Sequence, residues 1–275
     1  MKVLTALCIL LLVGTILVAI GALYSASVET ESLDFSLGSD QEIILAHVSD
    51  LHFPHSFLPA DDLVTLLSAQ NPDALLLTGD IFDGEATKEE IHAAATLLRA
   101  LRALCPCYMV IGNHEIGSEY LDDIRSVLTA CDVCLLQNET VTTTVKRTKI
   151  AFIGLSDGYL YTRETLSSLP VGDEDVKILL SHRPEKFSAY AGTPTDIRPD
   201  LVFAGHAHGG IARLGKLSLY APNQGLFPRY ASGAYTQNGV TMIVSRGLGI
   251  SGTDVRIYNK YHLPVAHLKN TSVSR

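Results

Sequence analysis

The chain has 275 residues, of which 47% are hydrophobic and 18% are charged, and its formal net charge is −8 at pH 7. This composition supplies a sizeable core and argues against a disordered protein. The acidic balance, without a basic run interleaved with aromatic residues, argues against nucleic acid as the principal partner. An anionic substrate would need positive charge concentrated at one site, which bound metal ions could supply.

The N-terminal part of the sequence is an uninterrupted apolar stretch from Val3 to Leu23, preceded by Lys2. Because about 20 apolar residues cross a bilayer core, residues 1–24 are predicted to be a single-pass transmembrane anchor. A cleaved signal peptide is the alternative, since small residues at 25–27 fit a cleavage site, although its apolar region usually has only about 7–15 residues. Lys2 before the span and acidic residues after it favour an extracytoplasmic location for the rest of the chain.

Residues 25–41 are polar and acidic, so we expect a linker there, followed by one domain over residues 42–270. In the first half of that domain, apolar runs typical of buried strands alternate with stretches that have helical periodicity or a capping box. The expected strands are 43–48, 74–78, 108–111 and 133–136, and the expected helices are 61–70, 87–104 and 119–130. This alternation predicts a parallel or mixed sheet covered by helices.

From residue 140 the pattern becomes more strand-like. Residues 140–145 and 149–155 are expected to form a hairpin, and apolar strands are expected at 176–180 and 201–204. Short strand-like runs with turn residues follow residue 211 and suggest a second, more antiparallel layer. The fold class is therefore predicted to be an α/β sandwich.

Four cysteines lie outside the apolar stretch, as Cys105, Cys107, Cys131 and Cys134. In an extracytoplasmic domain the two pairs could form disulfides with each other. Four thiolates could also hold a structural zinc ion, and reduced, packed thiols are the third interpretation. The spacing alone leaves all three open.

Polar clusters follow five of the predicted strands directly. Asp50 and His52 illustrate the pattern, because side chains two apart on extended backbone point to the same face and could contact one cation. Open α/β sheets bind ligands at the carboxyl ends of their strands, so the clusters are expected to converge. They supply seven oxygen and nitrogen donors: Asp50, His52, Asp80, Asn113, His182, His206 and His208. This mixture suits Mn²⁺, Fe²⁺ or Zn²⁺, and seven donors favour two ions that share a bridging carboxylate.

The motifs as a set resemble those of the calcineurin-like metallophosphoesterases. They are Asp50-x-His52, Gly79-Asp80-x-x-Asp83, Gly112-Asn113-His114-Glu115, Ser181-His182 and Gly205-His206-x-His208. The resemblance implies an αββα sandwich of mixed sheets. Within the family the chain is most similar to the membrane-associated bacterial phosphodiesterases that include some UDP-2,3-diacylglucosamine hydrolases, on the stretches 220–225 and 245–249. Ile211 stands where that branch would have Gln, which affects substrate contacts but no metal ligand.

The resemblance also implies a role for each motif residue. One metal ion would be held by Asp50, His52, Asp80 and His208, and the second by Asp80, Asn113, His182 and His206. Two such ions activate a water molecule near neutral pH and hold the phosphoryl oxygens. His114 would donate a proton to the leaving oxygen, and Asp83 would orient His114. A structural role remains the alternative for Asp83 and His114.

These observations predict a dinuclear-metal phosphoesterase, and more specifically a phosphodiesterase acting on a lipid-linked or cell-envelope phosphoester. A phosphomonoesterase of the same fold is the alternative, because both reactions use the same metal ligands. A non-catalytic metal-binding membrane protein is a third possibility. Arg183 and Arg246 could each contact substrate phosphate or serve as a structural ion-pair partner.

Overall fold

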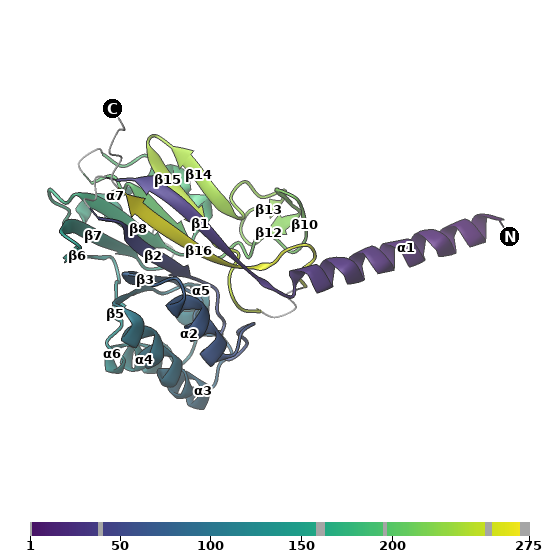
Figure 1. Cartoon of the computed structure of the whole chain (residues 1–275), viewed down its shortest axis with the longest axis horizontal. Helices are drawn as coiled ribbons and strands as arrows, with labels where there is room; N and C mark the ends of the chain where they lie inside the picture. Colours follow the sequence, from purple (N-terminus) through teal and green to yellow (C-terminus); the bar gives the residue numbers. More distant parts are fainter. Residues whose placement is uncertain (1, 38–40, 158–162, 195–196, 251–254, 270–275) are drawn as a thin grey trace.

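The computed structural model describes residues 2–37, 41–157, 163–194, 197–250 and 255–269, and it contains two six-stranded mixed sheets (Figure 1). The first sheet has the order β1-β16-β2-β3-β4-β5. Strands β2 to β5 are parallel to one another, β16 is antiparallel to β2, and β1 is parallel to β16. The bounds are β1 Val28–Ser36, β2 Ile43–Val48, β3 Ala74–Thr78, β4 Cys107–Val110, β5 Cys134–Leu135 and β16 Tyr261–Lys269.

The second sheet has the order β14-β15-β9-β8-β7-β6. Strands β15, β9, β8 and β7 are parallel neighbours, and each edge strand forms an antiparallel pair with the strand beside it. The bounds are β6 Glu139–Val145, β7 Thr148–Leu155, β8 Val176–Ser181, β9 Leu201–Ala204, β14 Gly233–Gln237 and β15 Val240–Val244. The hairpin of β6 and β7 confirms the sequence prediction. Its two-residue turn consists of Lys146 and Arg147, both with positive φ.

Helices cover the outer face of each sheet. Leu63, Ile91 and Leu101 are among the helical residues that pack against the first sheet, and Leu166 and Phe187 pack against the second. A separate apolar cluster that includes Leu45, Leu76 and Phe152 fills the space between the sheets. The helices are α2 Ala60–Ser68, α3 Lys88–Ala93, α4 Ala95–Leu104, α5 Asn113–Gly117, α6 Leu121–Ala130, α7 Arg163–Ser168, the 3₁₀ turn η1 Pro184–Lys186 and α8 Phe187–Tyr190. The layers are therefore αββα, as predicted.

The helix expected over residues 87–104 is two helices, α3 and α4, separated at Ala94. The predicted capping box is present at the start of α3. The Thr87 hydroxyl accepts a hydrogen bond from the Glu90 backbone N–H at 3.3 Å, and the Glu90 carboxylate accepts one from the Thr87 N–H at 2.8 Å.

Two small hairpins lie outside the sheets, beside the end of the N-terminal helix (Figure 1). The first pairs β10 Arg213–Leu214 with β11 Leu217–Ser218, and the second pairs β12 Tyr220–Ala221 with β13 Gly225–Leu226. This region carries exposed apolar side chains, which include Leu214, Leu226 and Phe227 at 77%, 73% and 62% exposure. The sequence prediction of short strands after residue 211 agrees with this region.

The N-terminal helix α1, Lys2–Ser25, projects away from the two sheets (Figure 1). It is long and apolar enough to cross a membrane. The linker expected over residues 25–41 is wrong for residues 28–36, because these form β1 and pair with β16 along its whole length. An acidic edge strand exposes alternate side chains, which is why its composition resembles that of a linker.

The structure contains the five cysteines as free thiols. Cys105, Cys107 and Cys131 are buried. Burial raises the pKa of Cys105 to about 11 and that of Cys107 to about 12, which favours the neutral thiol over the metal-binding thiolate. Of the three interpretations, reduced and packed thiols agree with the structure.

Candidate metal centre

The ends of five strands from both sheets bring the seven predicted metal ligands to one place. Asp50 and His52 follow β2, Asp80 follows β3, and Asn113 follows β4 in the first sheet. His182 follows β8, and His206 and His208 follow β9 in the second sheet. The site therefore depends on the face-to-face packing of the two sheets.

Five of the seven residues have left-handed backbone conformations. The φ angles are 49° for Asp50, 48° for His52, 51° for Asp80, 64° for His206 and 48° for His208. Non-glycine residues with such angles are uncommon, and strained backbone of this kind clusters at functional sites. Here it turns the side chains into the space between the strand ends.

Asp50, His52 and His208 form the first ligand group. Nε2 of His208 lies 3.4 Å from Oδ1 of Asp50 and 3.4 Å from Nε2 of His52. The carboxylate of Asp50 is fully buried and also accepts hydrogen bonds from the Ser49 hydroxyl and the His206 backbone N–H, at 2.6 and 2.9 Å. These donors fix the carboxylate in one orientation.

Asp80, Asn113, His182 and His206 form the second group. Nε2 of His182 lies 3.0 Å from Oδ2 of Asp80, 3.2 Å from Oδ1 of Asn113 and 3.1 Å from Nδ1 of His206. The other ring nitrogen of His182 lies 2.8 Å from the carbonyl oxygen of Thr78, which orients the ring.

Asp80 lies between the two groups of histidine ligands. Its carboxylate lies with His182 and His206 in one potential metal-binding group and with His52 and His114 in another. Oδ1 of Asp80 also accepts a hydrogen bond from the His114 backbone N–H at 2.9 Å. This position between the groups is the one a bridging carboxylate would occupy.

The donor geometry fits bound cations. In two places, imidazole nitrogens face each other, His52 with His208 at 3.4 Å and His182 with His206 at 3.1 Å. Facing lone pairs repel unless a proton or a metal ion lies between them. The residues therefore fit two divalent ions, with Asp50, His52, Asp80 and His208 able to hold one and Asp80, Asn113, His182 and His206 the other.

The charges of Asp80 and His206 agree with this fit. Burial acts to raise the pKa of Asp80, but the imidazoles of His182, His52 and His114 outweigh it, and the pKa is well below its ordinary value. Burial, together with His182 and Arg183, lowers the pKa of His206. Burial acts to lower the pKa of His182, but Asp80 and Asp50 outweigh it and raise that pKa to about 10, so this ring would release a proton when a metal ion binds. An ionised carboxylate and a neutral imidazole are the states that coordinate metal ions.

A cleft of about 330 Å³ opens beside the ligands. Asp80, Asn113, His114, His206 and His208 line one part of it. Ile211, Tyr220 and Pro222 line another and make that part of the wall largely apolar. The Ile211 position that departs from the expected Gln thus borders the site itself.

The family model described as "Calcineurin-like phosphoesterase" matches residues 43–210, which include all seven ligands. The chain is a calcineurin-like phosphoesterase. This family uses a dinuclear divalent metal centre. The sequence resemblance to the family is confirmed.

Relatives of this phosphoesterase span most of its length. The uncharacterized metallophosphoesterase YkuE of Bacillus subtilis is 31% identical over 82% of this chain and 77% of its own. Phosphodiesterase YaeI of Escherichia coli is 25% identical over 74% of this chain and 73% of its own. Among solved structures, Plasmodium GAP50, the anchor in the inner membrane complex, has the same fold, with a TM-score of 0.52 and 14% identity over 83% of this chain and 82% of its own.

In this phosphoesterase Asp83, which was expected to orient His114, lies close to both His114 and the metal ligand His52. Nδ1 of His114 accepts a hydrogen bond from the Gly84 backbone N–H at 3.0 Å, whereas Oδ2 of Asp83 is 4.0 Å away. The Asp83 oxygen is closer to Nδ1 of His52, at 3.4 Å. The Gly84 N–H thus helps to orient His114, and Asp83 lies nearer to the metal ligand His52 than to His114.

Glu115 belongs to a quoted motif of the phosphoesterase, but the sequence alone assigned it no role. Its fully buried carboxylate accepts hydrogen bonds from four backbone N–H groups, those of Asp80, Ile81, Phe82 and Gly112, at 2.7–3.0 Å. These bonds join the loop after β3 to the loop after β4. Gly112 allows this approach, because a Cβ there would clash with the Asp80 carboxylate and backbone.

Two further residues of the phosphoesterase support the second ligand group. The side-chain amide of Asn223 lies 2.7 Å from Nε2 of His206. Arg183 forms a two-bonded ion pair with Asp157, at 2.6 and 2.7 Å, and its Nη1 is 3.3 Å from the same His206 nitrogen. Asn223 lies in the quoted stretch 220–225, which is the signal by which it could have been found. Arg183 is a structural ion-pair partner that also borders the site.

Proposed function

We propose that this phosphoesterase is a membrane-anchored phosphodiesterase that hydrolyses a lipid-linked or cell-envelope phosphoester, with two divalent ions such as Mn²⁺, Zn²⁺ or Fe²⁺. The observation that carries the proposal is the cleft, which combines both ligand groups and His114 with an apolar wall. The polar part suits the phosphoryl group, and the apolar part suits a hydrocarbon or sugar–lipid substituent next to it.

The metal ligands, His114 and Asp83 would have different roles in this reaction. Divalent ions bound by these ligands would supply Lewis acidity to activate water and neutralise the phosphoryl charge. His114 lines the cleft, and its Nδ1 accepts the Gly84 N–H, so the neutral ring carries its proton on Nε2. Its Nε2–H would donate a hydrogen bond to the leaving oxygen. Transfer of a proton to that oxygen requires the ring to be protonated on Nδ1 as well, because a neutral ring that lost its Nε2 proton would become an imidazolate. Asp83 would fix the ring of His52.

The choice of a diester rests on a relative and on the surroundings of the cleft. Phosphodiesterase YaeI resembles this chain over most of its length. The exposed Leu226 pairs with the cleft residue Tyr220, and the exposed Phe227 follows it, which favours a substrate with a lipid part. The sequence resemblance to membrane-associated phosphodiesterases, including UDP-2,3-diacylglucosamine hydrolases, points to the same class.

The membrane assignment rests on α1. At about 1.5 Å per residue, its 24 residues extend about 36 Å, enough to cross a hydrocarbon core of about 30 Å. The positive Lys2 at its start and the acidic residues after it favour an extracytoplasmic domain. A cell-envelope substrate fits that location better than a cytoplasmic nucleotide-linked lipid.

The proposal is tested by hydrolysis of bis(p-nitrophenyl) phosphate and p-nitrophenyl phosphate by the full chain in detergent. We expect faster cleavage of the diester, loss of activity after chelation, and recovery on addition of Mn²⁺ or Zn²⁺. Asp80→Asn is the matched inactive control for a contaminating phosphatase. Preference for the monoester would support a phosphomonoesterase instead, and no turnover with two metal ions bound would contradict an enzyme acting on simple phosphoesters.

A further inference from the structure

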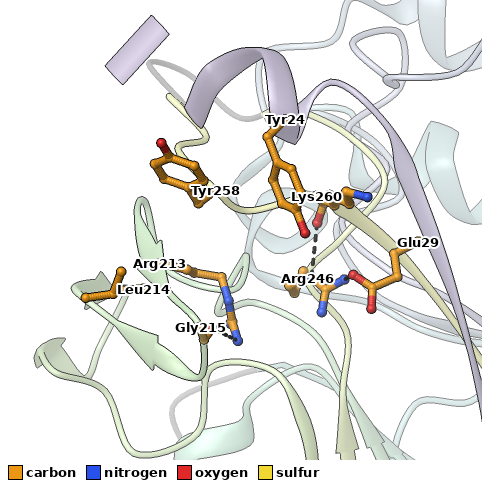
Figure 2. Close-up of a pocket in the computed structure, with 8 residues that line it drawn as sticks. All are labelled: Tyr24, Glu29, Arg213, Leu214, Gly215, Arg246, Tyr258 and Lys260. Carbon is orange, nitrogen blue, oxygen red and sulfur yellow. Dashed lines mark hydrogen bonds and ion pairs between the residues drawn. The ribbon is translucent and has the colours of Figure 1, made fainter. Parts of the chain in front are cut away.

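A second cavity, of about 310 Å³, lies where α1 meets the domain (Figure 2). Its walls come from parts of the chain that are distant in sequence: the end of α1, the start of β1, the β10–β11 hairpin and the segment before β16. It is lined by Tyr24, Glu29, Arg213, Leu214, Gly215, Arg246, Tyr258 and Lys260. None of these residues belongs to the metal centre.

The cavity contains more positive than negative charge. Figure 2 shows the guanidinium groups of Arg213 and Arg246 facing the same space, and Lys260 contributes a third cation. Arg246 is paired with Glu29 at 2.8 Å. Arg213 donates to the carbonyl oxygens of Gly209 and Gly215 and to the Ser218 hydroxyl.

Two of these cations lack an acidic partner. Within the described ranges, no carboxylate lies within ion-pair distance of Arg213 or Lys260. Burial and the neighbouring Arg246 lower the pKa of Arg213, which shows that its charge is poorly compensated. An anion would compensate both groups.

The position of the cavity identifies the kind of anion. The end of α1 is fixed to the domain, since the Gly21 carbonyl oxygen accepts from the Tyr258 N–H at 3.0 Å and the Ser25 hydroxyl accepts from the Asn259 N–H at 2.8 Å. With α1 across a bilayer, the cavity lies at the level of the lipid headgroups. Tyr24 has the place of an interfacial aromatic residue, and the exposed Leu214 can reach the acyl boundary.

We propose that this cavity binds the phosphate headgroup of an anionic membrane lipid. The phosphate group contacts Arg213, Lys260 on the other side of Tyr24 adds its positive charge to the cavity, and the acyl chains run along Leu214 and α1. Basic pockets beside transmembrane helices bind anionic headgroups by the same electrostatic attraction. The proposal rests on α1 lying in the bilayer, and it does not depend on the phosphodiesterase activity.

The lipid site is linked to the metal centre by short contacts. Arg213 donates to the carbonyl oxygen of Gly209 at 3.1 Å, and Asn259, whose backbone is held by α1, donates to the carbonyl oxygen of His208 at 2.7 Å. His208 and Gly209 are neighbours in the ligand loop after β9. A headgroup bound to Arg213 therefore contacts a residue that is hydrogen-bonded to this loop.

The experiment measures lipid binding to the full chain in detergent micelles by native mass spectrometry. Chelation removes metal ions first, so that neither hydrolysis nor phosphate binding at the metal centre contributes. The probes are phosphatidylglycerol, phosphatidylcholine with the same acyl chains, and inorganic phosphate. Lys260→Gln and Arg213→Gln remove one charge each, and Arg99→Gln removes a charge from an exposed position on α4.

We expect phosphatidylglycerol to bind at least tenfold more tightly than phosphatidylcholine. Each cavity variant should weaken that binding about fivefold, the size expected for one cation at an anionic membrane surface, and Arg99→Gln should not. Lys260 makes a cation–π contact with Tyr24 and no side-chain hydrogen bond among the described residues, so Lys260→Gln decides the test if Arg213→Gln does not fold. Equal binding of the two lipids, binding unchanged by Lys260→Gln, or equally tight binding of inorganic phosphate would overturn the proposal.

Discussion

At the residue scale, two buried carboxylates in neighbouring loops have different tasks. Asp80 faces the imidazoles of the metal centre, while Glu115 accepts hydrogen bonds from four backbone N–H groups. Burial and the charge of Asp80 raise the pKa of Glu115, and the backbone donors oppose this shift. Asp80 is thus positioned to bind metal ions, and Glu115 fixes the backbone of the loop that contains Asp80.

His114 and Asp80 should respond differently to substitution. Asp80→Asn removes the charge shared by both ligand groups, so we expect it to lose bound metal and activity together. His114→Ala should keep two metal ions per chain but lose about 10²–10⁴-fold in kcat, the usual contribution of a general acid. Metal content by plasma emission spectrometry and kcat on a diester with a poor leaving group check both outcomes.

His92→Ala is the control for this pair, because His92 is exposed on α3, away from the ligands. Full activity of His114→Ala on the poor leaving group would refute the acid role. Metal retained at the wild-type level in Asp80→Asn would refute the bridging position.

At the scale of single elements, β1 completes the first sheet. It covers the edge of β16, and Glu29, Glu31 and Asp34 on β1 pair with Arg246, His262 and Lys269. Without β1, the backbone groups of the largely buried strand β16 would be unpaired on that side. The strand is therefore part of the folded domain.

Two shortened chains test the role of β1. A chain that begins at residue 27 keeps β1 and should fold, whereas one that begins at residue 37 loses it. We expect the unfolding temperature of the second chain to be lower by about 10 °C. Each kcal/mol of stability lost lowers that temperature by roughly 2–4 °C in a domain of this size, and loss of β1 should remove a few kcal/mol. Calorimetry measures the difference, and equal unfolding temperatures would restore the linker interpretation.

The elements also show what the sequence could and could not reveal. The strand ends and their donors were predictable, because apolar runs followed by Asp50, Asp80 and His182 form a local pattern. β1 was missed although Leu33 and Phe35 alternate with exposed residues, because acidic composition outweighed a short period-2 signal. The contact of Asp83 with His52 depends on how two loops pack, and no local pattern encodes that arrangement.

At the scale of the whole molecule, α1 and the domain are connected by defined contacts. Gly21 packs so closely that a Cβ would clash with Ile257 and Tyr258, and Ser25 is buried. A signal peptide is cut away from its domain, and such contacts would then be lost. The packing therefore supports an uncleaved anchor.

An uncleaved anchor has a measurable consequence. The protein purified from membranes should still contain residues 2–25, and it should remain in the membrane fraction after alkaline carbonate extraction. Intact-mass spectrometry and immunoblotting of the fractions check this expectation. A mature chain that begins near residue 27 in the soluble fraction would show that α1 is a signal peptide.

The pairing of β1 with β16 also determines when the domain can fold. Val28 pairs with Tyr261, so the two strands lie near opposite ends of the sequence, and β16 also separates β1 from β2. The first sheet can therefore close only after residue 269 has left the ribosome and, for an extracytoplasmic domain, crossed the membrane. Until then, the edge of β2 that pairs with β16 has no partner strand. An unpaired edge can associate with other chains, so we expect chaperones to bind this folding intermediate.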